Sequence, residues 1–153
     1  MTGEQDHPKH ASVSAWAKRC YFAGRALMDS ALRPYDLGST QWYVLWQLAN
    51  VGPTMQRDLV RTLTIERARL SGIVATLVRK GLVAQVPDHV DQRQRLLQLT
   101  ASGKKLWDEL PDLAFIHKVA FEGIDAAAIA TAISVLQTAT ERLDVFSQKA
   151  TEP

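Results

Sequence analysis

Several features of secreted and membrane proteins are scarce in this sequence. The 153 residues include one cysteine, Cys20, so no disulfide can form within the chain, which is typical of proteins in reducing compartments. No apolar run approaches the roughly 20 residues that span a membrane, and the polar N-terminus lacks the apolar core of a signal peptide. We therefore expect a cytoplasmic protein with no membrane association.

The sequence also lacks the patterns of enzymes. It contains no Ser/His/Asp set, pair of carboxylates, phosphate-binding loop or dinucleotide fingerprint. Its four histidines and single cysteine show no zinc-ligand spacing. We expect no catalytic residues, no cofactor and no metal site.

What is present is a helical composition with a basic middle. Only 8 glycines and 6 prolines occur, and helix-forming residues are abundant, which predicts a mostly α chain. The formal net charge is only +2, but cations gather between residues 56 and 95, as a phosphate-binding surface requires. A solvated charged face is the alternative explanation of this stretch.

The hydrophobic periodicity predicts helices over 11–32 and 41–50, the second capped by Ser39 or Thr40. Two helices then follow across a tight turn, 55–63 (opened by Thr54) and 66–80, and Gly81 stands at the C-cap position of the second. Strands at 82–86 and 95–99 form a hairpin. Thr100 begins a helix over 101–121, kinked or broken at Pro111, and Asp125 caps a last helix that extends to about residue 148.

This order predicts a winged helix-turn-helix, mostly α, with a two-stranded β wing and flanking N- and C-terminal dimerisation helices. We expect a disordered tail at 1–10 and a single regulator domain at 11–153. Within it, a DNA-binding lobe at 39–103 lies between dimerisation helices at 11–34 and 104–149. A helix fits the major groove, and a cation at the hairpin tip suits the narrow minor groove.

The helix at 66–80 divides into two faces. Leu70, Ile73, Val74 and Leu77 recur at the spacing of a core-facing stripe. The other face carries two arginines near its start and small residues that allow close approach to base edges. The residues expected on that face are Arg67, Ala68, Ser71, Gly72 and Ala75, with Arg69 at its edge.

Three runs between residues 39 and 103 stand out: L-V-R-T-L-T-I-E at 59–66, the leucine-spaced helix that ends at Gly81, and above all D-H-V-D-Q-R at 88–93 followed by L-Q-L-T-A-S-G at 97–103. By these runs, residues 39–103 resemble the MarR family of transcriptional regulators. The last two runs match the family's wing pattern without gaps. One departure is Thr64, where the family often has glycine.

The resemblance implies roles for the wing residues. Arg93 corresponds to the arginine that enters the minor groove. Asp91 corresponds to the acidic residue that orients it, with Arg95 a further partner of that carboxylate. An exposed ion pair of little consequence is the alternative. The expected DNA-binding residues are Arg57, Arg67, Ala68, Arg69, Ser71, Gly72, Arg93 and Arg95, with Asp91 orienting the wing.

The outer helices are too apolar for a monomer surface. Pairing them in a homodimer would set two recognition helices about one DNA turn apart, which predicts binding to a pseudo-palindromic, double-stranded operator. The resemblance implies the same dimer and a repressor released by a small aromatic or phenolic ligand. Residues considered for that ligand are Trp16, Cys20, Tyr21, Arg25, Trp42, Trp46, Phe115 and His117. Ordinary packing also explains each residue considered for the ligand.

Two other functions stay open: redox sensing and constitutive DNA binding. Some family members sense oxidants through a cysteine, and Cys20 lies in the corresponding first helix, although a lone cysteine on an apolar helical face is commonly just packed. The third hypothesis is a constitutive DNA-binding factor with no ligand.

Overall fold

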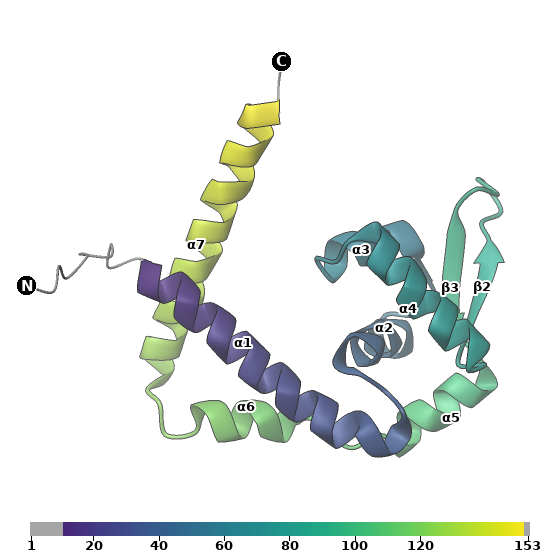
Figure 1. The fold of residues 1–153 in the computed structure, drawn as a ribbon, viewed down its shortest axis with the longest axis horizontal. Helices are drawn as coiled ribbons and strands as arrows, with labels where there is room; N and C mark the ends of the chain where they lie inside the picture. The colour runs from purple at the N-terminus through teal and green to yellow at the C-terminus, as the bar shows by residue number, and fades with distance from the viewer. Residues whose placement is uncertain (1–10, 152–153) are drawn as a thin grey trace, which may run out of the picture. The chain divides into compact units, whose positions relative to one another are not determined.

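Helices account for most of the chain, as the composition predicts. The computed structural model describes residues 11–151 and divides by its contacts into two units, one ending at Leu113 and one beginning at Ala114. The predicted tail at 1–10 lies outside the described residues. The elements of the first unit, drawn in Figure 1, are α1 (Ala11–Leu32), the 3-10 helix η1 (Arg33–Tyr35), α2 (Ser39–Asn50), β1 (Thr54–Met55), α3 (Gln56–Thr62), α4 (Arg67–Arg79), β2 (Val83–Pro87), β3 (Arg95–Leu99) and α5 (Ala101–Glu109).

The three strands form one antiparallel sheet in the order β1-β3-β2. In the hairpin, Val83 faces Leu99 and Pro87 faces Arg95. On the other edge of β3, Thr54 pairs with Leu97. The hairpin is the predicted wing, and together with the α3–α4 pair it confirms the winged helix-turn-helix fold.

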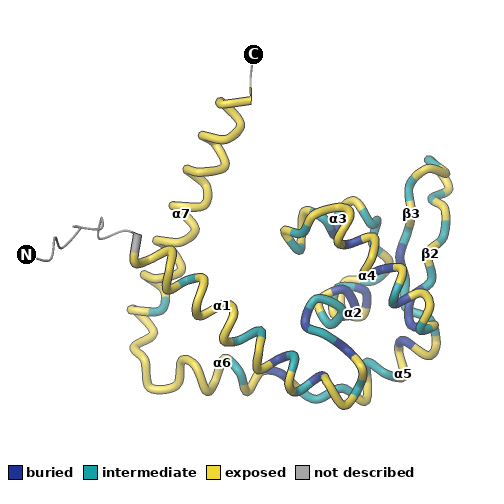
Figure 2. Tube along the Cα trace, in the orientation of Figure 1, coloured by how far each residue is buried: buried dark blue, intermediate teal, exposed yellow. Residues whose placement is uncertain are grey.

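The core of this unit forms beneath α4. Leu70, Val74 and Leu77 are almost fully buried, as the periodicity predicts, whereas Ile73 is only half-buried. Figure 2 shows buried positions in α2, α4 and the sheet, and the buried side chains that accompany α4 include Leu45 of α2 and Leu97 of β3. Because burying one leucine contributes ~1.5–3 kcal/mol, this stripe fixes which face of α4 meets solvent.

The turn between α3 and α4 contains a residue in left-handed conformation. Thr64 has φ of 50°, and its N–H donates to the carbonyl of Arg61 at 3.3 Å. A β-branched side chain is strained at this φ, whereas glycine is not. The departure from glycine noted in the sequence therefore carries a conformational cost, although the turn still forms.

The end of α4, the base of the hairpin and the start of α5 meet at one junction. Gly81, with φ of 73°, ends α4 at the predicted position. The Thr100 hydroxyl donates to the Gly81 carbonyl at 2.5 Å and accepts from the Gly103 N–H at 3.0 Å, which confirms Thr100 as the cap of α5. A Cβ on Gly103 would lie 2.0 Å from the Leu82 carbonyl oxygen, so only glycine fits there.

Two predicted helix starts are wrong. Ser39 and Thr40 do not cap α2: Gly38 precedes it, Ser39 is its first residue, and the Ser39 N–H donates to the Asp29 carboxylate at 2.7 Å. Thr54 does not open α3 but lies in β1, because its backbone pairs with β3. Because β1 has only two residues, it is too short to show the alternation of apolar and polar residues by which a strand is recognised in a sequence.

The predicted helix at 101–121 is broken near Pro111, so that α5 ends at Glu109 and the second unit begins with α6 (Ala114–Phe121) and continues with α7 (Ala126–Thr151). As predicted, Asp125 stands before the last helix, and its carboxylate accepts from the Ala127 N–H at 3.3 Å. Neither α6 nor α7 has a buried residue. Apolar side chains exposed on α7 include Ile133, Leu136, Leu143 and Phe146.

Within the described residues, no single helix is both long and apolar enough to cross a membrane. The segments 101–121 and 126–151 reach that length and apolar content only when they are taken together as a bent pair. The predicted division into a DNA-binding lobe and dimerisation helices stays a prediction, as does the single domain. By its contacts, α5 belongs with the first unit.

We expect Gly103→Ala to lower the free energy of unfolding by about 2–3 kcal/mol, because the new methyl group overlaps the Leu82 carbonyl. Chemical denaturation of the full chain measures this. Gly72→Ala is the matched control: its Cβ meets nothing within 4 Å on an exposed helix, so it should stabilise by about 0.5–1 kcal/mol. Equal effects of the two substitutions would contradict the close approach.

Thr64→Gly should raise the free energy of unfolding by about 1 kcal/mol, because glycine removes the strain at φ of 50°. Thr64→Ala should gain less, since its Cβ remains. Thermal and urea unfolding of the three proteins give the ranking. A destabilised glycine variant would show that the Thr64 side chain contributes more than its backbone conformation costs.

Candidate nucleic-acid interface

The α4 residues expected to contact DNA lie on the face of the helix that turns away from the core. Arg67, Ala68, Arg69, Ser71 and Gly72 are all exposed. Because α4 begins at Arg67, the first two arginines stand in its first turn, where backbone N–H groups lack partners within the helix. Cationic side chains and N–H groups at one helix end form a suitable surface for a phosphate.

Three arginines of the lobe are available to an anion. Arg57 on α3 is exposed like Arg67 and Arg69, and within residues 11–151 none of the three makes an ion pair. Arg61 differs, because its guanidinium contacts the Asp58 carboxylate at 2.7 Å. The basic middle of the sequence therefore divides into paired and unpaired cations.

The wing tip is organised by two aspartates. The Asp88 carboxylate accepts from the Asp91 N–H at 3.1 Å. The Asp91 carboxylate accepts from both the backbone N–H and the Nε of Arg93, at 3.1 and 3.4 Å. The Arg93 side chain is 92% exposed and that of Asp91 39%, so the carboxylate contacts one nitrogen of a guanidinium that otherwise meets solvent. Arg95 donates to the Gln92 carbonyl at 3.0 Å rather than to Asp91.

Two glutamines missed by the sequence reasoning connect the elements of this surface. The Gln56 amide donates to the Ser71 hydroxyl at 3.2 Å, and the Gln85 amide donates to the Gln56 carbonyl oxygen at 2.8 Å. They bring α3, α4 and β2 together on one exposed surface. Separations of 15 and 29 residues leave no local signal by which the sequence reveals these contacts.

A cavity of about 240 Å³ lies behind the first turn of α4. Tyr21 and Arg25 of α1 line it, together with Thr40 and Tyr43 of α2 and residues 62–65 of the turn. Arg69 also lines it, so one side chain of the recognition helix borders both the cavity and the outer surface. The Arg25 guanidinium donates to the Thr40 hydroxyl at 3.0 Å.

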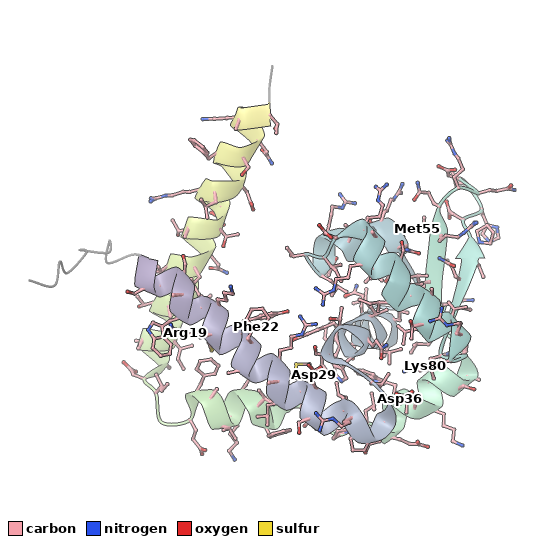
Figure 3. All side chains as sticks on the ribbon, viewed as in Figure 1. Arg19, Phe22, Asp29, Asp36, Met55 and Lys80 are labelled. Carbon is pink, nitrogen blue, oxygen red and sulfur yellow. The ribbon has the colours of Figure 1, made fainter. Side chains whose placement is uncertain are left out.

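Charged groups border a larger, open cleft of about 710 Å³ beside this cavity, which shares Arg25, Thr40 and Arg69 with it. Its Lys80 contacts the carboxylate and carbonyl of Asp36, and these two side chains lie near each other in Figure 3. Asp29, also labelled there, is engaged with the Ser39 N–H. Arg25 and Arg69 therefore line both the cavity and the cleft. The two aspartates of the cleft already have partners within the chain, Lys80 for Asp36 and the Ser39 N–H for Asp29.

Tyr43 adds a neutral donor to the smaller cavity. Burial raises the pKa of the Tyr43 phenol, the neighbouring Tyr21 raises it further, and Arg25 opposes the shift. The phenol therefore keeps its proton at neutral pH, and its hydroxyl lies 3.6 Å from the Met28 sulfur. A neutral phenol and a guanidinium in one cavity suit a ligand that combines an aromatic ring with a carboxylate.

The structure brings together only some of the residues considered for a ligand. Tyr21 and Arg25 line the smaller cavity, whereas Trp42 packs on Tyr43 and Trp107 with ring centroids 5.2 and 5.5 Å apart. Trp16 is 63% exposed beneath the Arg19 guanidinium. Cys20 and Trp46 are exposed on α1 and α2 and are not among the residues that line the cavity. Phe115 and His117 belong to α6 in the second unit.

Within the described residues, no group of three His, Cys, Asp or Glu side chains is arranged to hold a metal ion. This finding covers the part of the chain from 11 to 151.

Comparison with known proteins gives consistent results. A family model described as MarR family matches residues 35–94. The HTH-type transcriptional regulator FarR of Neisseria gonorrhoeae is 31% identical over 102 residues, which cover 67% of this chain and 70% of that protein. The matches to curated relatives span from about half, 47%, to 70% of the relative's length.

Solved structures share the fold. A mutant of MarR from E. coli in complex with operator DNA has a TM-score of 0.74 at 22% identity, over 84% of this chain and 93% of that one. BpsR of Bordetella bronchiseptica, whose DNA binding is described as regulated by 6-hydroxynicotinic acid, has a TM-score of 0.72 at 25% identity, over 84% and 98%.

Proposed function

This chain belongs to the MarR family, and from that premise we propose that it is a homodimeric repressor that a small aromatic or phenolic acid releases from a pseudo-palindromic operator. The relatives compared above are regulators, and we expect this protein to act in the cytoplasm, where its DNA is. The observation that carries the proposal is the joining of α3, α4 and β2 on one exposed surface that bears unpaired arginines.

The geometry of that surface supports docking on duplex DNA. The exposed face of α4 has small residues at Ala68, Ser71 and Gly72, which let the helix approach base edges in the major groove. At the wing, Asp91 contacts the Nε of Arg93 and leaves the terminal nitrogens of the guanidinium for a minor groove to accept. The E. coli relative of the same fold was solved on operator DNA.

Unpartnered apolar side chains support a dimer. Phe146 and Leu143 of α7 are 73% and 67% exposed, and α1 exposes Trp16 and Phe22. A monomer that left such side chains in water would forgo about 25 cal/mol for each Å² of apolar surface that pairing buries. Two-fold pairing also places two recognition helices on successive major grooves.

The cavity behind α4 supports an effector. An aromatic acid fits the combination of Arg25, Tyr21 and the neutral Tyr43 phenol, and 6-hydroxynicotinic acid, the ligand described for BpsR, is of this class. Its carboxylate would also attract Arg69 away from DNA. Ligand binding then favours a conformation in which the recognition helices no longer match the operator.

Arg93→Ala should weaken binding to every DNA sequence and make the salt dependence of log K shallower by about one unit, because one cation fewer displaces counterions. Arg67→Ala should instead change base preference, at a cost of about 1–3 kcal/mol for the base it reads. Gel-shift titrations at several salt concentrations, on DNA from upstream of the gene and on a scrambled duplex, measure both. Arg61→Ala, whose guanidinium is already paired with Asp58, is the control. Two lobe variants that bind like the parent would overturn the docking.

Salicylate, benzoate and 6-hydroxynicotinate should raise the melting temperature of the protein and release it from its operator, because they bind the native cavity. Arg25→Ala should abolish both effects. Arg19→Ala, on the same helix but outside the cavity, should preserve them. If the parent responds to none of these acids but loses DNA on peroxide treatment, and thiol blocking prevents that loss, the redox function through Cys20 replaces this one. No response to any treatment favours a constitutive factor.

A further inference from the structure

The hydrogen-bond chain Gln85–Gln56–Ser71 joins three elements across the exposed surface of the lobe. Gln85 lies on β2, Gln56 is the first residue of α3, next to the Met55 labelled in Figure 3, and Ser71 lies on the outer face of α4. Gln85 and Ser71 are exposed and Gln56 is half-buried. Neither glutamine is among the residues expected to contact DNA.

Each link of this chain has a direction. The Gln85 amide nitrogen donates to the Gln56 carbonyl oxygen at 2.8 Å, which leaves the Gln56 amide nitrogen to donate to the Ser71 oxygen at 3.2 Å. A serine hydroxyl has one hydrogen and two lone pairs. Because Gln56 donates to the Ser71 oxygen, and because no described group within residues 11–151 accepts from Ser71, the hydroxyl hydrogen is left available to a partner outside the chain.

We propose that Gln85 and Gln56 hold Ser71 as a hydrogen-bond donor toward the major groove, so that at one operator position the protein selects a base that presents an acceptor and rejects cytosine. The acceptors are purine N7, guanine O6 and thymine O4, whereas cytosine presents its N4 amino group. The inference rests on the proposed DNA binding. Ser71 is the base-contacting residue, and the two glutamines are positioning residues.

Docking strengthens this directionality. In the free protein, water competes for the exposed amides, so the chain is weak. Bound DNA displaces that water, and hydrogen bonds that polarise one another are stronger in a drier environment. Two facing donors, such as Ser71 and a cytosine amino group, then leave both hydrogens unsatisfied. The wing strand, through Gln85, thereby influences which base α4 selects.

The test is randomised-site selection with the full-length protein, followed by affinities on single-base variants of the selected site. Ser71→Ala identifies the position that Ser71 reads, because only there should the preference against cytosine, about two- to tenfold, disappear. Gln85→Leu should weaken the same preference without abolishing it. Without the hydrogen bond from Gln85, the Gln56 amide group can rotate by 180° and present its oxygen to the Ser71 hydroxyl for part of the time.

The decisive variant is Gln56→Glu. A carboxylate only accepts hydrogen bonds, so it takes the Ser71 hydrogen and turns an oxygen lone pair toward the groove. The preference at that position should reverse toward cytosine or adenine, whose amino groups donate. The substitution should not impair folding, because an acidic residue at the first position of α3 favours the helix dipole, and a thermal melt verifies this.

Gln92→Glu is the matched control. It introduces the same charge in the wing, outside the hydrogen-bond chain, and should lower affinity on all sequences without changing any preference. A Ser71→Ala variant with the parent's base profile would overturn the inference while leaving the proposed function intact. A Gln56→Glu variant that behaves like Gln92→Glu would show that the amides do not set the direction. A parent protein that selects no sequence would overturn the proposed function itself.

Discussion

The carbonyl oxygen of Leu82 lies where three elements meet, and the exposed surface of α4 and the wing depends on how closely they approach there. Gly103 brings the start of α5 against that oxygen, and no other residue fits. The N–H of Thr100 also donates to it, at 3.1 Å, while the Thr100 hydroxyl bonds the end of α4 at Gly81. The angle between α4 and the wing is therefore set at this junction, by residues that are not among the expected DNA contacts.

The sequence predicted the parts of the molecule that repeat or that follow a local rule. The stripe of Leu70, Val74 and Leu77 identified the buried face of α4, and the wing pattern located the hairpin. Sequence reasoning failed where non-local contacts decide the outcome. The strand β1 exists because β3 offers an edge, and Ser39 enters α2 because Asp29, ten residues earlier, takes its N–H.

The same distinction applies to the candidate site. The wing pattern singled out Arg93, whereas residue type alone did not distinguish Arg67, which makes no ion pair within the described residues, from Arg61, which is paired with Asp58. The sequence did not predict that Tyr43 lines the cavity, because an aromatic residue on a helix is ordinarily a packing residue. Arg69 borders both the outer surface and the cavity, so on the proposed function base reading and ligand response would share one side chain.

The exposed apolar surface of α7 has a consequence for dosage. Neither helix of the second unit buries a residue within its own chain, so on the proposed pairing its stability comes from a second copy. By mass action, when protein is scarce the number of pairs grows with the square of the number of chains. A cell that doubles synthesis from a low level would then nearly quadruple the operator-competent species, which makes control by this regulator steeper than its own expression.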